Sequence, residues 1–273
     1  MRTGLIEGLS MDDYQNDPAY SAGDLIRMGE SFRKWKYFKE NKKPPTRAMV
    51  VGSATGLILE SKLTKKPHLI SSQIAIYSDG SSKTKGFEKF CAERKEAYCL
   101  DEDEFSLSDR CVDAVLAEPE CMKYLDGAIA EPSIFVTDPE FGFRRKCRPD
   151  FLHIKQGVSI NIKTTTDASE YGFTRSIADF AYDWQTLNYQ DVLRLHFDRS
   201  FDEIHILVEK ADEGPLTVRI RGIDDDTLEQ ARGQVFLIRE KLAAAIKNQK
   251  FEDAPACLEV STIPAWARRL AQL

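Results

Sequence analysis

The chain has 273 residues, of which 42% are hydrophobic and 30% are charged, and its 38 Lys and Arg residues against 44 Asp and Glu residues give a formal net charge of −6. This composition excludes an intrinsically disordered chain, and the length allows a sizeable hydrophobic core. No run of roughly 18 apolar residues occurs, so no membrane-spanning helix is expected. The N-terminal stretch already carries Glu7, Asp12 and Asp13, so we expect no secretory signal and a cytoplasmic protein.

The first half of the chain predicts helices. Ser21 followed by Asp24 has the pattern of a helix N-cap, and the helix that it opens is expected to end before Pro44. A second helix is expected over residues 47–63, with an apolar face that looks buried. Residues 84–125 predict further short helices with polar breaks.

The second half alternates strands and helices. Residues 128–136, 143–154 and 158–163 have strand character and are separated by turn-forming residues, which predicts a three-stranded meander. There follow a long helix, two strands and a second long helix, expected over residues 170–195, 203–209, 216–223 and 225–248. This order predicts a single α/β domain over residues 1–273, with helices flanking a mixed central sheet.

The cysteines argue against a metal or redox role. The six are scattered over positions 91–257, and no pair has C-x-x-C spacing. Zinc ribbons, redox motifs and iron–sulfur cluster sites are therefore excluded, and reduced thiols used as small apolar fillers are expected.

Three side chains on the predicted meander have the chemistry of a hydrolytic site. Glu131 lies in the first predicted strand, Asp150 follows Arg148-Pro149, and Lys163 ends the third strand. Strand alternation places Asn161 on the same face as Lys163. Carboxylates hold a hard cation such as Mg²⁺, and a lysine can orient the attacking water in phosphodiester hydrolysis. The spacing alone also fits a solvated hairpin with an exposed lysine.

Several short motifs, in one order over about residues 10–270, carry a more specific resemblance. They are Tyr20-Ser21 with Leu25, Gly52-Ser53-Ala54, Glu131 before Ser133-Ile134-Phe135, Cys147-Arg148-Pro149-Asp150, Lys163-Thr164-Thr165, Gln185 with Tyr189, and Ile263-Pro264-Ala265-Trp266-Ala267. Together they resemble the catalytic domain of the RecE-type exonuclease VIII family, whose members are RecB-related nucleases with the PDDEXK (restriction-endonuclease-like) fold.

The resemblance implies an activity and a site. The implied activity is Mg²⁺- or Mn²⁺-dependent exonuclease digestion of linear duplex DNA from the 5′ end during recombination. The family hands a 3′ single strand to an annealing protein and suggests a toroidal homo-oligomer. By residue match, Glu131, Asp150 and Asn161 correspond to metal ligands. Asp150 and Lys163 correspond to the catalytic pair, and Gln185 and Tyr189 support the site and the DNA.

Two departures from the family pattern bear on activity. Asn161 stands where the family has Asp, and Thr55 or Gly56 stands where the family has His. An amide brings no charge to a cation, so weaker metal binding and slower chemistry are expected. Asn161 fits either natural divergence or an engineered inactivating change. The alternative function is an inactive PDDEXK domain that binds DNA ends or a protein partner.

Two basic clusters are candidate DNA contacts in this acidic protein. Residues 33–47 hold seven cations in fifteen positions, interleaved with aromatic residues, and Arg33, Lys36, Lys39 and Lys43 are the expected contacts. A second cluster at residues 144–148 leads into the site and adds Arg145 and Arg148. The alternative for the first cluster is a solvated helix face with its aromatic residues in the core. The four histidines, at positions 68, 153, 196 and 205, are expected to be core or surface residues.

Overall fold

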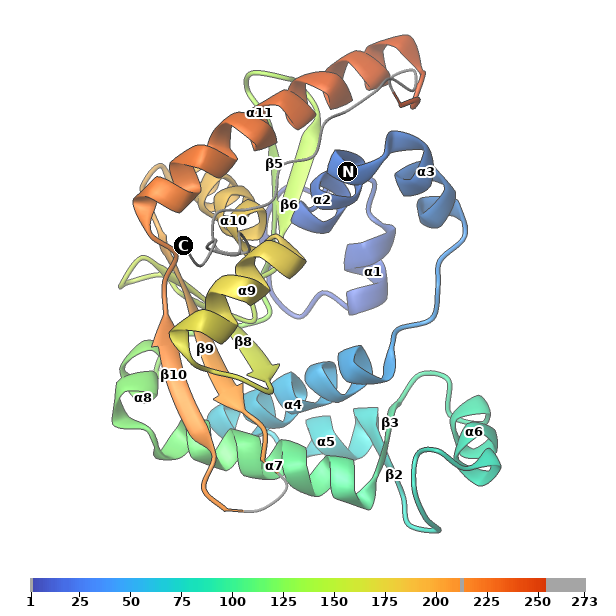
Figure 1. The fold of residues 1–273 in the computed structure, drawn as a ribbon. Helices are drawn as coiled ribbons and strands as arrows, with labels where there is room; N and C mark the ends of the chain where they lie inside the picture. Colours follow the sequence, from blue (N-terminus) through green and yellow to red (C-terminus); the bar gives the residue numbers. More distant parts are fainter. Residues whose placement is uncertain (1, 212–213, 254–273) are drawn as a thin grey trace, which may run out of the picture.

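The computed structural model describes residues 2–211 and 214–253 (Figure 1). The Ile263–Ala267 motif therefore lies outside the described residues. The helices are α1 (Met11–Asn16), α2 (Ala22–Glu30), α3 (Phe32–Glu40), α4 (Arg47–Thr64), α5 (His68–Gln73), α6 (Lys85–Ala92), α7 (Glu102–Ala117), α8 (Pro119–Leu125), α9 (Glu170–Phe180), α10 (Tyr182–Phe197) and α11 (Asp225–Asn248).

The largest sheet has five strands in the order β10-β9-β8-β7-β4. Within it β8 and β9 run parallel, whereas the other neighbours are antiparallel. A second sheet has the order β1-β5-β6, and β2 pairs with β3 in parallel. The strands are β1 (Gly4–Ile6), β2 (Ile74–Tyr77), β3 (Tyr98–Asp101), β4 (Ile129–Ala130), β5 (Ser133–Thr137), β6 (Arg144–Cys147), β7 (Phe151–His153), β8 (Val158–Thr165), β9 (Asp202–Glu209) and β10 (Thr217–Arg221). This mixed α/β architecture confirms the predicted fold class.

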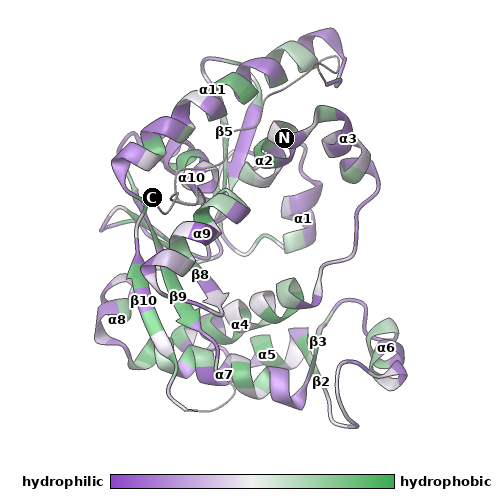
Figure 2. Cartoon of the chain, in the orientation of Figure 1, coloured by the Kyte–Doolittle hydropathy of each residue, from purple (hydrophilic) through white to green (hydrophobic). Residues whose placement is uncertain are grey.

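The five-stranded sheet lies between two helical layers. One face carries Ile160, Ile206 and Val208, which are buried against apolar side chains of α4 and α7 in the largest core cluster. These elements lie together in Figure 1 and carry much of the hydrophobic colouring in Figure 2. Helix α10 contacts the opposite face at β9 and also contacts β5 and β6. The polar residues of β8 and β9 therefore point toward α10.

The predicted meander is wrong, because each of its first two strands divides between two sheets. Residues 128–136 form β4 and β5, and residues 143–154 form β6 and β7. Glu131 therefore lies between strands, with a φ of 45° in the left-handed region. The breaks coincide with Pro132 and Pro149, which have no backbone N–H to donate to a strand ladder.

Two predicted helices are each divided in two. Ser31 ends α2 and also caps α3, because its hydroxyl accepts the backbone N–H of Lys34. Ala181, at a φ of 51°, separates α9 from α10. The Ser21–Asp24 capping box, α4, α11, β9 and β10 agree with the sequence expectations to within a few residues.

Candidate functional site

Strand register brings the predicted metal and catalytic residues to one edge of β8. Phe151 pairs with Ile160, so the preceding residue, Asp150, lies beside Asn161. The Asp150 carboxylate accepts the backbone N–H of Ile162 at 2.7 Å. Burial raises the pKa of Asp150, and the nearby Lys163 opposes that shift. Asp150, Asn161 and Lys163 therefore share one neighbourhood, and strand alternation had predicted this for Asn161 and Lys163.

Helix α10 completes this neighbourhood. The Lys163 amine donates a long hydrogen bond to Gln185 Oε1 at 3.5 Å, and Gln185 Nε2 donates to Asn161 Oδ1 at 3.3 Å. The same amine lies 4.8 Å from the ring centroid of Tyr182. One helical turn after Gln185, the hydroxyl of Tyr189 donates to the backbone carbonyl of Arg148 at 3.0 Å. Gln185 thus positions the lysine, whereas Tyr189 holds the segment that leads to Asp150.

Glu131 reaches the same region through its backbone. Its N–H donates to the Asp150 carbonyl at 2.8 Å, while its carboxylate forms an ion pair with the Arg148 guanidinium. Arg148 also donates to the Leu9 carbonyl at 2.7 Å and to Ser133 Oγ at 3.2 Å. In this arrangement the charge of Glu131 is already balanced by an arginine.

Two further carboxylates were not predicted from the sequence. Glu60, on α4, has a pKa raised by burial and by the charge of Glu131. Glu203, on β9, is 5% exposed and accepts hydrogen bonds from Asn161 Nδ2 at 3.0 Å and from Ser159 Oγ at 3.2 Å. Burial raises the pKa of Glu203 to about 8, against the opposing effect of Lys163. The available signal was the two-residue spacing of Glu203 and His205, which places both side chains on one face of a strand whose later residues are apolar.

The donor set fits a hard divalent cation in its chemistry. Asp150 and Glu131 supply carboxylate oxygens and Asn161 an amide oxygen, which are ligands that Mg²⁺ and Mn²⁺ accept. Their arrangement is less complete, because Arg148 holds Glu131 and Gln185 holds the Asn161 oxygen. Within residues 2–211 and 214–253, no three His, Cys, Asp or Glu side chains gather closely enough to hold a metal ion.

Thr55 and Gly56, the two candidate positions for the family's histidine, differ in how much space surrounds them. Thr55 is buried, and its hydroxyl donates to the Val51 carbonyl at 2.8 Å. Gly56 is partly exposed, and a Cβ built there would meet nothing within 4 Å. Gly56 also lies one helical turn before Glu60. A Cβ at position 56 therefore has room, whereas a histidine at position 55 would have to replace a buried threonine.

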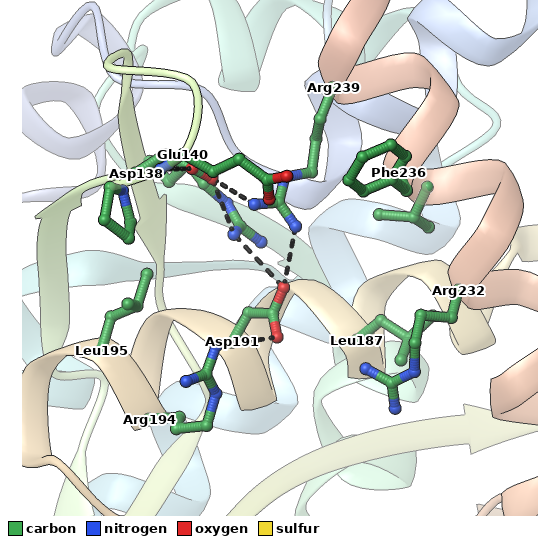
Figure 3. Close-up of a pocket in the computed structure, with 12 residues that line it drawn as sticks. Asp138, Glu140, Leu187, Asp191, Arg194, Leu195, Arg232, Phe236 and Arg239 are labelled. Carbon is green, nitrogen blue, oxygen red and sulfur yellow. Dashed lines mark hydrogen bonds and ion pairs between the residues drawn. The ribbon is translucent and has the colours of Figure 1, made fainter.

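Arg145 cannot contact DNA in this structure, so its prediction as a DNA contact is wrong. Its side chain is fully buried, and its guanidinium donates to Asn188 and forms ion pairs with Asp138 and Asp191, each at 3.3 Å. Figure 3 shows Asp138, Asp191 and Arg239 pointing toward one another. They line a cavity of about 210 Å³ whose lining includes neither Asp150 nor Lys163. Alternation along β6 directs this arginine under α10, where it joins strand to helices and has no access to solvent.

The basic helix α3 is only partly available for DNA. Arg33 forms an ion pair with Asp253 at 3.0 Å, and Lys39 forms one with the buried Asp24 at 3.1 Å. Lys36 and Lys43 are exposed, although the Lys43 amine lies 4.4 Å from the ring centroid of Phe38. Two cations of the predicted set, Lys36 and Lys43, remain free of carboxylate partners among the described residues.

Comparisons with known proteins agree with the observed fold. The family described as "PDDEXK-like domain of unknown function (DUF3799)" matches residues 31–259. The fold is similar to the crystal structure of a "putative exonuclease" from Eubacterium rectale, with a TM-score of 0.61 and 16% identity over 95% of this chain and 96% of that chain. A search of curated proteins found no match. No helix in the described part of the chain is long and apolar enough to cross a membrane.

Proposed function

Because the chain belongs to the family of PDDEXK-like domains DUF3799, we propose that it is a metal-dependent exodeoxyribonuclease domain that acts on the ends of linear duplex DNA. The observation that carries the proposal is the meeting of Asp150, Asn161, Lys163 and Gln185 at one edge of β8. Such a set of oxygen ligands with an adjacent amine serves phosphodiester hydrolysis better than it serves a purely structural role.

Each residue of the site would have a separate role in phosphodiester hydrolysis. Asp150, Glu131 and Asn161 would hold Mg²⁺ or Mn²⁺, which when bound supplies an activated water and stabilises charge on the phosphate. Lys163 is held by Gln185 and faces the Tyr182 ring, so its amine is positioned to orient the nucleophile. Tyr189 anchors the Arg148 carbonyl and so fixes the approach of Asp150.

The finer features of the proposal follow the resemblance to the RecE-type family. They are 5′-to-3′ digestion, participation in recombination, transfer of the single strand to an annealing protein, and assembly into a homo-oligomer. Lys36 on α3 and Lys43 in the segment after α3 are the proposed phosphate contacts, and Arg148 acts inside the site through Glu131. Arg33 and Lys39 would have to exchange a carboxylate partner for DNA.

A second candidate function is DNA-end or partner binding without cleavage. It is favoured by the chain of hydrogen bonds from Lys163 through Gln185 and Asn161 to Glu203, which satisfies the polar groups of the site with one another. A site closed in this way can bind a phosphate backbone through nearby cations and still fail to bind a catalytic metal.

The test is cleavage of a linear duplex carrying a label at each end, in Mg²⁺ or Mn²⁺, beside a covalently closed circle. We expect the linear duplex to be shortened and the circle to stay intact. Lys163→Met should abolish cleavage and preserve binding of DNA ends. End binding without cleavage by the unmodified protein, at any metal concentration, would favour the binding function.

A further inference from the structure

Glu203 and His205 lie on the same face of β9 as the Asp150–Lys163 edge. Parallel register pairs Ser159 with Glu203 and Asn161 with His205, and directly paired residues point to the same face of a sheet. Asp150, which directly precedes β7, therefore lies in one row with Asn161 on β8 and His205 on β9. Glu203 lies one step below this row.

His205 is a buried polar group without a partner. Its side chain is 0% exposed, and neither ring nitrogen has a hydrogen-bond partner among the described residues. The imidazole is fixed by the rings of Tyr182 and Phe173, whose centroids each lie 5.4 Å from its own. Burying a polar group unpaired costs about 1–3 kcal/mol, so a ring held in this state calls for a ligand or another compensating role.

The distance between His205 and Glu203 suits a shared ion. His205 Nε2 lies 3.8 Å from Glu203 Oε1, which is too long for a hydrogen bond. Two ligands on bonds of about 2.1 Å are separated by roughly 3.0 Å when adjacent in an octahedron and by roughly 4.2 Å when opposite, so a change of less than about 1 Å from 3.8 Å would bring both onto one ion. Asn161 is the third donor, since a half-turn of its amide would direct Oδ1 toward Glu203.

We propose that Glu203 and His205, with Asn161, form a divalent-cation site on β9 that replaces the carboxylate missing at position 161. The inference rests on the proposed nuclease function for its place in the reaction, but the cation site itself is testable without DNA. An imidazole ligand makes the site favour Mn²⁺ over Mg²⁺, because Mg²⁺ prefers oxygen ligands alone.

The positively charged Lys163 amine repels a cation at the Glu203–His205 site. It lies close enough to act on both Glu203 and His205 electrostatically. Its hydrogen bond to Gln185 and its position over the Tyr182 ring direct it along α10, and the ring face disperses part of its charge. A metal ligand must be deprotonated, so Glu203 would lose its proton on cation binding and, with Asp150, would supply two negative charges against the single positive charge of Lys163.

The experiment is Mn²⁺ and Mg²⁺ titration of the whole chain by calorimetry, with thermal unfolding in each metal as a second readout. Glu203→Gln keeps the acceptor for Asn161 but removes the charge. His205→Phe keeps a ring between Tyr182 and Phe173, removes the unpartnered nitrogens and is expected to fold at least as well. Asp202→Asn removes the same charge from an exposed position on β9 and is the matched control.

We expect one Mn²⁺ site in the unmodified chain, weakened tenfold or more in both Glu203→Gln and His205→Phe. The preference for Mn²⁺ over Mg²⁺ should disappear in His205→Phe, and Asp202→Asn should match the unmodified chain. Absence of Mn²⁺ binding overturns the inference. Unchanged binding in both β9 variants with loss in Asp150→Asn also overturns it, and in that case the proposed nuclease function on the β8 ligands stands.

Discussion

Replacing Asn161 by Asp tests whether an added negative charge in the site strengthens cation binding. The side chains are nearly equal in size, so packing should change little, but the Asn161 Nδ2 that donates to Glu203 Oε1 becomes a carboxylate oxygen. At that 3.0 Å separation, two full charges would repel by about 5–6 kcal/mol at an effective dielectric constant of about 20. The two acids should therefore keep one proton between them, and the site should gain one negative charge.

That charge should strengthen cation binding. Each tenfold gain in affinity or rate corresponds to about 1.4 kcal/mol, so replacing a neutral amide by a carboxylate should raise Mg²⁺ affinity about tenfold or more. Exonuclease rate should rise with it, up to about a hundredfold. The assays are calorimetric Mg²⁺ titration and digestion of end-labelled linear duplex under the same conditions.

A double variant separates the two positions. Asn161→Asp combined with Glu203→Gln moves the single carboxylate from β9 back to β8 and removes the repulsion, so it should bind Mg²⁺ more tightly than Glu203→Gln alone. The reasoning fails if Asn161→Asp binds Mg²⁺ no better and leaves linear duplex intact while DNA ends are still bound. Binding without cutting would then be the function of this domain.

Three other predictions address the basic residues. Arg145→Met should lower the free energy of unfolding in urea by about 3 kcal/mol, because it leaves buried carboxylates with fewer partners, and the salt dependence of DNA binding should stay as it is. Lys36→Ala should flatten the salt dependence of DNA binding by about one unit of slope and leave stability unchanged. Lys39→Ala should lower stability, because it leaves the buried Asp24 without its cation. Equal effects of the two variants on both properties would contradict these different roles. Burial lowers the pKa of Lys146 from 10.5 to about 8. Between pH 8 and pH 10.5 the unfolded chain therefore holds the Lys146 proton more strongly than the folded chain does. The contribution of Lys146 to stability consequently rises with pH over this interval. The stability of the unmodified chain relative to Lys146→Met should therefore grow by about 1 kcal/mol from pH 8.5 to 9.5, and a constant difference between the two proteins would refute the shift.

The sequence by itself determined the elements whose signal is local. Apolar periodicity and the Ser21–Asp24 cap predicted helices, and alternation placed Asn161 and Lys163 on one face of a strand, because side-chain direction in helices and strands follows from residue spacing. The order of the motifs was enough to indicate the PDDEXK fold, which the family match over residues 31–259 supports.

Tertiary structure decided which side chains meet. Local propensity treats residues 128–136 as one strand, but the chain turns at Glu131 and enters a second sheet, which a pairwise spacing argument cannot see. Arg145 looked like a solvent-facing cation until α10 and α11 covered it. Glu203 and His205 are more than 40 residues from Asn161 in sequence, and only the parallel pairing of β8 with β9 brings them beside it. Contacts of this kind depend on sheet order, and sheet order is set by how the whole chain buries its apolar faces.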